Sequence, residues 1–120
     1  MLNLDTHIVI YFLEESLSDR ELHAIVSEGA AISGIVLWEL AKLRQKGRAN
    51  IDLESSLFRS FLRTLRIYPI TPEIAATSTY LDFSSDPADE IIAATSIVEK
   101  IPLLTRDRRI QQSKMVPFAL

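Results

Sequence analysis

The sequence contains no cysteine. That absence excludes disulfide bonds, thiol catalysis and metal sites built from thiolates. Only two histidines, His7 and His23, are present, so a structural zinc site is not expected either. No apolar run is long enough to cross a membrane, because charged or polar residues break every one. The first residues carry neither a basic segment nor a small-residue cleavage site, and we therefore expect no secretory signal and a cytoplasmic protein.

The sequence also has no internal repeat, no low-complexity tract and no linker rich in proline or glycine. Its 120 residues fit one domain, which we expect to span residues 1–120. Hydrophobic residues make up 48% of the chain, which is enough for a buried core. The net charge of −3 weighs against nucleic-acid binding, but the objection weakens if some acids form a cluster that divalent cations neutralise, because the count without four acids is +1. The net charge alone therefore excludes no substrate class.

Short apolar runs alternate along the chain with amphipathic stretches. This alternation predicts an α/β fold in which helices cover a mostly parallel sheet. The expected strands are residues 2–4, 30–33, 67–71, 101–105 and 116–120, and the expected helices are residues 6–16, 18–29, 34–47, 52–66, 71–81 and 86–100. Residues 6–16 also suit a strand because they are rich in β-branched side chains. A helix cap at Thr6 and an apolar face formed by Ile8, Tyr11 and Phe12 favour the helix.

Two aspartates follow predicted strands. Asp5 interrupts the apolar start of the chain, where a charge is costly unless it is paired, protonated or bound to a cation. Asp107 lies two residues after the predicted strand 101–105. Ligands of such sheets gather beyond the carboxyl ends of the strands, so both side chains are expected at the same edge. The alternative is that each aspartate only caps the helix that follows it.

Further acids lie on predicted helices. Glu39 has mostly apolar helical neighbours, so it borders the face that packs on the core, unless it pairs with Lys42 or Arg44 at the surface. Asp86 is expected to be the N-cap of its helix, and Asp89 lies one turn later on the same face. Acids are also favoured there by the helix dipole, which is the structural alternative for Asp89.

Together these acids can form one site, made of Asp5, Glu39, Asp89 and Asp107. An oxygen-only, multiply charged cluster suits hard cations, and the candidates are Mg²⁺ and Mn²⁺. Several carboxylates close together would raise one another's pKa unless a cation stabilised the ionised forms. Such a site is suited to phosphodiester hydrolysis by a metal-activated water that attacks in line.

The ordered series LDTH, VLWEL, DPADEIIAAT and LLTRD resembles the PIN-domain nucleases, and most closely the VapC toxins of bacterial and archaeal type II toxin–antitoxin pairs. The resemblance covers essentially the whole chain. It implies a PIN-like three-layer α/β sandwich with a mostly parallel central sheet flanked by helices. It also implies a Mg²⁺-dependent endoribonuclease that acts on RNA, is held inactive by a VapB-like antitoxin and forms a homodimer.

Carried over onto this sequence, the acidic quartet of the family falls on Asp5, Glu39, Asp89 and Asp107, with no substitution. The accessory positions that the resemblance implies are Thr6, Ser33, Thr105 and Asp86. Candidate phosphate contacts near the site are Arg106, Arg108, Arg109 and Lys114, with Arg44, Lys46 and Arg48 further away; for each, a solvated surface charge is the alternative. Candidate residues of an antitoxin groove are Tyr11, Phe12 and Trp38, for which core packing is the alternative. His7 is expected to be a rim or packing residue.

Two other functions compete with the ribonuclease toxin. The first is a catalytically inactive PIN-type module that binds RNA or protein, which the intact quartet argues against. The second is a phosphate-accepting regulator with Asp5 as the acceptor. That class needs a lysine near its acidic pocket, whereas the strand ends of this sequence offer arginines.

Overall fold

Four short parallel strands form the centre of the computed structural model, which describes residues 1–120. Across the sheet they run in the order β3 (Arg66–Tyr68), β2 (Ala30–Ser33), β1 (Leu2–Leu4) and β4 (Leu103–Leu104). Every neighbouring pair is parallel, so the connections must cross over the sheet, and helices provide them. The predicted α/β class with a parallel sheet is confirmed.

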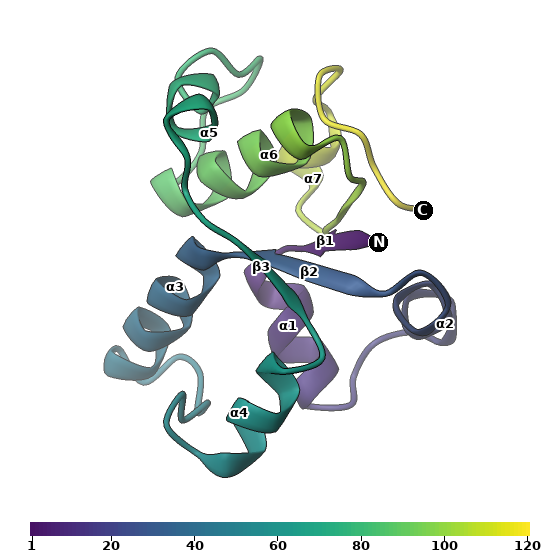
Figure 1. Ribbon diagram of the computed structural model, residues 1–120, viewed down its shortest axis with the longest axis vertical. Helices are drawn as coiled ribbons and strands as arrows, with labels where there is room; N and C mark the ends of the chain where they lie inside the picture. Colours follow the sequence, from purple (N-terminus) through teal and green to yellow (C-terminus); the bar gives the residue numbers. More distant parts are fainter.

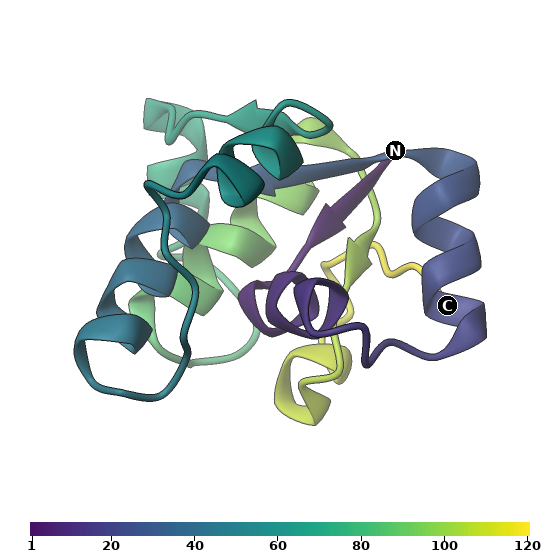
Figure 2. The ribbon, with the colours of Figure 1, turned by 90° about the horizontal axis from the view of Figure 1, so that it is seen from below.

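The helices are α1 (Thr6–Leu13), α2 (Asp19–Glu28), α3 (Gly34–Gln45), α4 (Ser56–Leu62), α5 (Pro72–Thr77), α6 (Pro87–Glu99) and α7 (Arg108–Gln111). Figure 1 shows α5 and α6 above the sheet and α1, α3 and α4 below it, which gives the three layers. Figure 2 shows α1 at the centre of the lower face, with α3 on one side and α2 on the other. None of these helices is both long and apolar enough to span a membrane.

The strands β1, β2 and β4 are buried on both faces, which explains why they are almost continuously apolar, whereas Arg66 and Ile67 of the edge strand β3 are exposed. Asn3 is the exception in β1, and it is fully buried. Its Nδ2 donates to the carbonyl oxygen of Ile92 at 3.1 Å and to Oγ of Ser96 at 2.9 Å. These bonds fix α6 against β1, and therefore fix the start of α6 relative to the end of β1.

Three predicted boundaries are wrong. The first helix is capped by Asp5 and not by Thr6, because the Asp5 carboxylate accepts the backbone N–H of Thr6. The predicted helix 52–66 is reduced to α4, because Ser55 caps a helix that begins only at residue 56. The predicted strand 116–120 is a single bridge between Phe118 and Leu103, since Pro117 has no N–H to continue the ladder.

Two further strands end earlier than predicted. The strand expected at 67–71 ends at Tyr68, immediately before Pro69, which cannot donate to a ladder. The strand expected at 101–105 contains only Leu103 and Leu104. The helix starts that carry strong signals agree with expectation: Ser18 and Glu21 form a capping box, Thr71 caps α5, and α6 begins at Pro87.

Candidate active site

The predicted acids come from four different elements. Asp5 directly follows β1, and Asp107 follows β4, its neighbour in the sheet. Glu39 lies in the middle of α3, and Asp89 lies in the first turn of α6. Asp5 and Asp107 therefore lie beyond the carboxyl ends of adjacent parallel strands, where ligands of such sheets bind.

Asp5 is the most buried of these acids, with only 4% of its surface exposed. Its Oδ1 accepts the backbone N–H of Thr6 at 2.8 Å, and its Oδ2 accepts the hydroxyl of Thr105 at 2.6 Å. Burial raises the pKa of Asp5 above its ordinary value, the two hydrogen bonds oppose that rise, and the charge of Asp107 adds to it. Asp5 is thus both a helix cap and a carboxylate held in a fixed orientation.

Glu39 is linked to Asp5 through Thr6. The Thr6 hydroxyl donates a hydrogen bond to Oε1 of Glu39, and the Thr6 N–H donates to Asp5. Burial raises the pKa of Glu39, and the charge of Asp5 raises it further. Neither Lys42 nor Arg44 forms an ion pair with Glu39, so the surface-pair alternative does not describe this residue.

The pKa of Asp89 is shifted in the direction opposite to the one expected at a helix start. The first turn of a helix stabilises a carboxylate and lowers its pKa, yet burial raises the pKa of Asp89 to about 6. Neighbouring charges act in the same direction, and they belong to Asp5, Glu39 and Asp107. Oγ of Ser85 donates to Oδ2 of Asp89 at 2.7 Å and opposes the rise. Asp89 therefore belongs electrostatically to the group of acids.

Asp107 caps α7. Its Oδ1 accepts the backbone N–H groups of Arg109 at 2.9 Å and Ile110 at 3.2 Å. Its own N–H donates to the Thr105 hydroxyl oxygen at 3.0 Å, the same group that binds Asp5. Asp5 and Asp107 do cap the helices that follow them, as the alternative interpretation expects. This capping does not conflict with a shared site, because it engages only one oxygen of each carboxylate.

Neighbouring acids, Asp107 among them, help to raise the pKa of Asp5, Glu39 and Asp89, although no three acidic or histidine side chains converge tightly enough to hold one metal ion by themselves. Mg²⁺ is commonly held by one or two carboxylates, with water and substrate phosphate completing its shell. The oxygens available to a cation here all belong to carboxylates. Hydrogen bonds engage one oxygen each of Glu39, Asp89 and Asp107, whereas both oxygens of Asp5 accept one. The donor set therefore fits a hard divalent cation.

The predicted accessory residues differ in what they contact. Thr6 and Thr105 each bind carboxylates of the quartet. Ser33 instead caps α3 by accepting the N–H of Ile35. Asp86 occupies the N-cap position of α6 without a side-chain capping bond.

Sequence reasoning missed Ser85. Its hydroxyl binds Asp89 from the residue before the helix cap, a position where a serine is a common turn residue and carries no specific signal.

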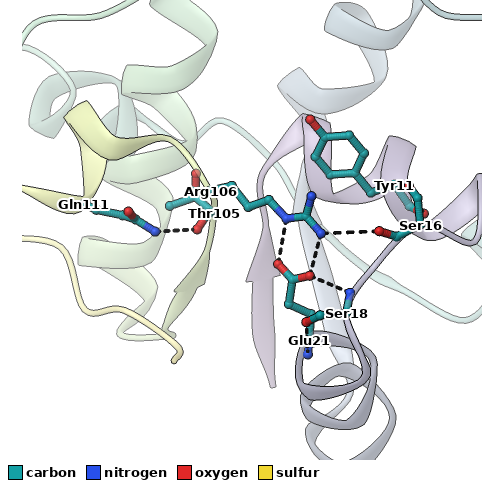
Figure 3. Close-up of polar contacts among 7 residues, drawn as sticks. All are labelled: Tyr11, Ser16, Ser18, Glu21, Thr105, Arg106 and Gln111. Atoms are coloured by element: carbon teal, nitrogen blue, oxygen red, sulfur yellow. Dashed lines mark hydrogen bonds and ion pairs between the residues drawn. The ribbon is translucent and has the colours of Figure 1, made fainter.

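Arg106, a predicted phosphate contact, is engaged within the protein (Figure 3). Its Nε and one terminal nitrogen donate to the two carboxylate oxygens of Glu21 at 2.9 Å and 2.7 Å. The guanidinium also lies 4.4 Å from the ring centroid of Tyr11. The ion pair lowers the pKa of Glu21 to about 2. Arg106 thus joins the segment between Thr105 and Asp107 to the start of α2.

Comparison with known proteins gives consistent matches over nearly the whole chain. A family model described as PIN domain matches residues 3–114. The chain is 32% identical to Ribonuclease VapC22 of Mycobacterium tuberculosis over 117 residues, which is 92% of this chain and 90% of that protein.

Two solved structures share the fold. A toxin–antitoxin complex from Klebsiella pneumoniae is 24% identical, with a TM-score of 0.71 and coverage of 93% of this chain and 91% of that chain. VapBC2 from Rickettsia felis, bound to a promoter DNA fragment, is 20% identical, with a TM-score of 0.72 and coverage of 99% and 98%.

Proposed function

The chain belongs to the PIN-domain family, in which it is related to the VapC ribonucleases, and we propose that it is a Mg²⁺-dependent endoribonuclease that serves as the toxin of a toxin–antitoxin pair. One observation carries the proposal. Carboxylates from four separate elements gather beyond the carboxyl edge of the sheet, and the pKa values of three of them are raised, those of Asp5, Glu39 and Asp89. A group of acids that repel one another is unfavourable for folding alone, and it suits a cation-dependent site.

Mg²⁺, or Mn²⁺ in its place, would be held by oxygens of Asp5, Glu39, Asp89 and Asp107. When bound, such an ion lowers the pKa of water and neutralises charge on a phosphodiester. The hydroxyls of Thr6, Thr105 and Ser85 donate to these carboxylates, so they favour the ionised forms and fix which oxygens remain available.

Phosphate contacts around the site would come from Arg108, Arg109 and Lys114, none of which forms an ion pair. Arg106 forms an ion pair with Glu21, so its role would be to hold the Thr105–Asp107 segment in place and not to contact phosphate. The homodimer stays a prediction.

The test is cleavage of RNA by the purified protein after metal has been stripped. We expect no cleavage in EDTA, full recovery with Mg²⁺ or Mn²⁺, and no recovery with Ca²⁺ at equal concentration, because Ca²⁺ prefers a larger and more flexible coordination shell. Full cleavage in EDTA would refute the metal requirement. RNA binding with no cleavage under any metal would favour the catalytically inactive module.

An apolar groove supports the antitoxin part of the proposal. It has a volume of about 690 Å³ and lies between α1, α2 and α4, where its apolar lining is Phe12, Leu13, Leu17, Leu22, Leu57 and Phe61. Leu57 is 77% exposed and Leu22 is 42% exposed, which is costly for side chains of this size unless a partner covers them. Of the three predicted groove residues, only Phe12 lines it; Tyr11 contacts Arg106, and Trp38 lies on α3.

Co-expression with the product of the neighbouring gene tests this groove. We expect a stable complex in which RNA cleavage is suppressed. Leu57→Glu should release the partner, because it places a charge on the apolar lining. Tyr80→Glu is the matched control, since Tyr80 is 69% exposed and lies outside the groove. Separate elution of the two wild-type proteins at micromolar concentration would remove the support for a toxin–antitoxin pair.

A further inference from the structure

A second pocket adjoins the candidate active site. Its volume is about 410 Å³, and it lies between the C-terminal half of α3 and the start of α6. Its charged and aromatic lining is Trp38, Glu39, Lys42, Lys46, Arg48 and Asp86, and we call it the α3–α6 pocket. Glu39, one of the proposed catalytic acids, forms part of its wall, so a molecule bound in the pocket would extend directly into the site.

Three cations and two acids line this pocket, so cations outnumber acids there although the protein as a whole is acidic. Residues 42–48, with the sequence KLRQKGR, contain no acid. Arg44 forms an ion pair with Asp52, whereas Lys42, Lys46 and Arg48 form none. The helix dipole accounts for cations in the last turn of α3, but Arg48 lies beyond the end of that helix.

Trp38 supplies an exposed aromatic surface beside these cations. It immediately precedes Glu39 on α3, and 54% of its surface is exposed. Nζ of Lys42 lies 5.8 Å from the centroid of the indole ring. An aromatic ring flanked by cations is the combination that binds single-stranded nucleic acid, because bases stack on the ring and phosphates contact the cations.

We propose that the α3–α6 pocket binds a nucleotide of single-stranded RNA next to the scissile phosphate. The base stacks on Trp38, and the backbone phosphates contact Lys42, Lys46 and Arg48. This inference rests on the proposed ribonuclease function and adds to it the residues that hold the nucleotide beside the cleaved bond. That nucleotide must be unpaired, since only an unstacked base can reach the ring. A second copy of the chain fits the pocket less well, because a symmetric interface would bring the same cations together.

Trp38 is the only tryptophan in the chain, so its fluorescence reports directly on the pocket. The first experiment titrates the wild-type protein with a ten-nucleotide single-stranded RNA and with a duplex of equal length. The buffer contains Ca²⁺, which we expect to neutralise the acids without supporting cleavage, and a gel verifies that the RNA stays intact. Anisotropy of a labelled strand measures saturation independently. We expect the single strand to quench Trp38 and the duplex to leave its fluorescence unchanged.

The second experiment compares variants in steady-state cleavage with Mg²⁺. Trp38→Leu should raise KM for single-stranded RNA roughly tenfold with little change in kcat, the effect of losing one base–aromatic stack. Trp38→Phe should retain most of the affinity, because it keeps a ring. Tyr80→Leu is the matched control, an exposed aromatic outside the pocket, and should leave both constants unchanged.

Salt dependence tests the cations of the pocket. Lys46→Gln and Arg48→Gln should each reduce the slope of log Kd against log salt by about 0.7, the value for one phosphate contact on a single strand. Arg63→Gln, at an exposed cation on the C-cap of α4 without an ion pair, should leave the slope unchanged.

Several results would overturn the proposal. Unchanged Trp38 fluorescence at saturating single-stranded RNA would do so, even if the enzyme cleaves RNA normally. Quenching that depends on protein concentration without RNA would assign the surface to self-association. If instead the single strand quenches Trp38 while Mg²⁺ supports no cleavage, the pocket stands and the ribonuclease function fails.

Discussion

The hydroxyl of Thr105 donates a 2.6 Å hydrogen bond to Oδ2 of Asp5, a residue 100 positions earlier in the chain. The oxygen of that hydroxyl also accepts the backbone N–H of Asp107 at 3.0 Å. One small side chain thus joins two of the proposed catalytic acids, which follow adjacent strands of the sheet. Because Asp5 is buried, this bond also opposes the rise in its pKa.

Thr105→Val should remove this link while it preserves the shape of the side chain. The variant leaves Oδ2 of Asp5 buried without its donor, so we expect a loss of about 1–3 kcal/mol in the free energy of unfolding. The pKa of Asp5 should rise further, which shifts the acidic limb of the cleavage–pH profile to higher pH. Urea unfolding and cleavage rates across a pH series measure the two effects.

Two comparisons make the Thr105 result specific. Thr105→Ser keeps the donor and should restore both stability and the pH profile. Thr64→Val is the control, because the hydroxyl of the exposed Thr64, which follows α4, donates only to the nearby carbonyl of Phe61. Wild-type stability and an unshifted profile in Thr105→Val would show that the hydrogen bond does not control the state of Asp5.

The ion pair between Arg106 and Glu21 is predicted to stabilise the segment that carries Asp107. It is bidentate, at 2.9 Å and 2.7 Å, but Arg106 remains 44% exposed, so solvent weakens it. A double-mutant cycle with Arg106→Gln and Glu21→Gln should give a coupling energy of roughly 0.5–1 kcal/mol. A coupling energy of zero would mean that the two side chains contribute independently.

The pKa of Glu21 fixes the pH range of that coupling. It is lowered to about 2, so the stabilisation is present above the ordinary glutamate pKa and is lost as pH falls through the range from 4.5 to about 2. Chemical denaturation of the wild type and the double variant should therefore differ at pH 6 and converge near pH 2.

Much of the fold could be predicted because its signals are local. The capping box at Ser18 and Glu21 and the proline at the start of α6 mark helix starts, and the structure has both. The errors arose where the apolar pattern predicted a longer helix or strand than the backbone groups allow. The pattern of residues 52–66 continues a helical face, but Ser55 begins the helix only at residue 56, and Pro117 stops a final strand that its apolar neighbours suggest.

The candidate site was predicted less completely. Acids at strand ends and in a helix start could be read from sequence because each follows a recognisable boundary. Of the groups that orient them, Thr6 and Thr105 were expected from the family resemblance, and Ser85 was missed. The partners of these groups are brought together only by packing, as Thr6 is with Glu39 and Ser85 with Asp89. Sequence spacing carries no information about such pairs unless they share a helix or a hairpin.

The raised pKa of Asp89 predicts how pH affects the metal-free protein. A carboxyl with a pKa near 6 in the folded state and 3.8 otherwise binds more protons when folded, so its contribution to stability falls as pH rises between those values. Asp89→Asn should therefore stabilise the metal-free protein more at pH 7.5 than at pH 5, where the wild-type group is already largely protonated. Thermal unfolding in EDTA at the two pH values measures the difference. An equal effect at both would show that Asp89 titrates normally.

Substitution of all four acids separates a shared site from four independent structural roles. We expect Asp5→Asn, Glu39→Gln, Asp89→Asn and Asp107→Asn each to abolish RNA cleavage in Mg²⁺. For Asp89 the metal-free midpoint of thermal unfolding should be unchanged or raised, because the change removes a buried charge that its neighbours repel. If Asp89 only interacted with the dipole of α6, the same change would lower the free energy of unfolding by about 0.3–1 kcal/mol and leave activity unchanged.

Glu90→Gln is the matched control, since Glu90 lies next to Asp89 in the first turn of α6 and is not a proposed metal ligand. It should keep cleavage. An active Asp89→Asn with a lowered midpoint would therefore remove Asp89 from the catalytic set and leave it as a residue of the helix start.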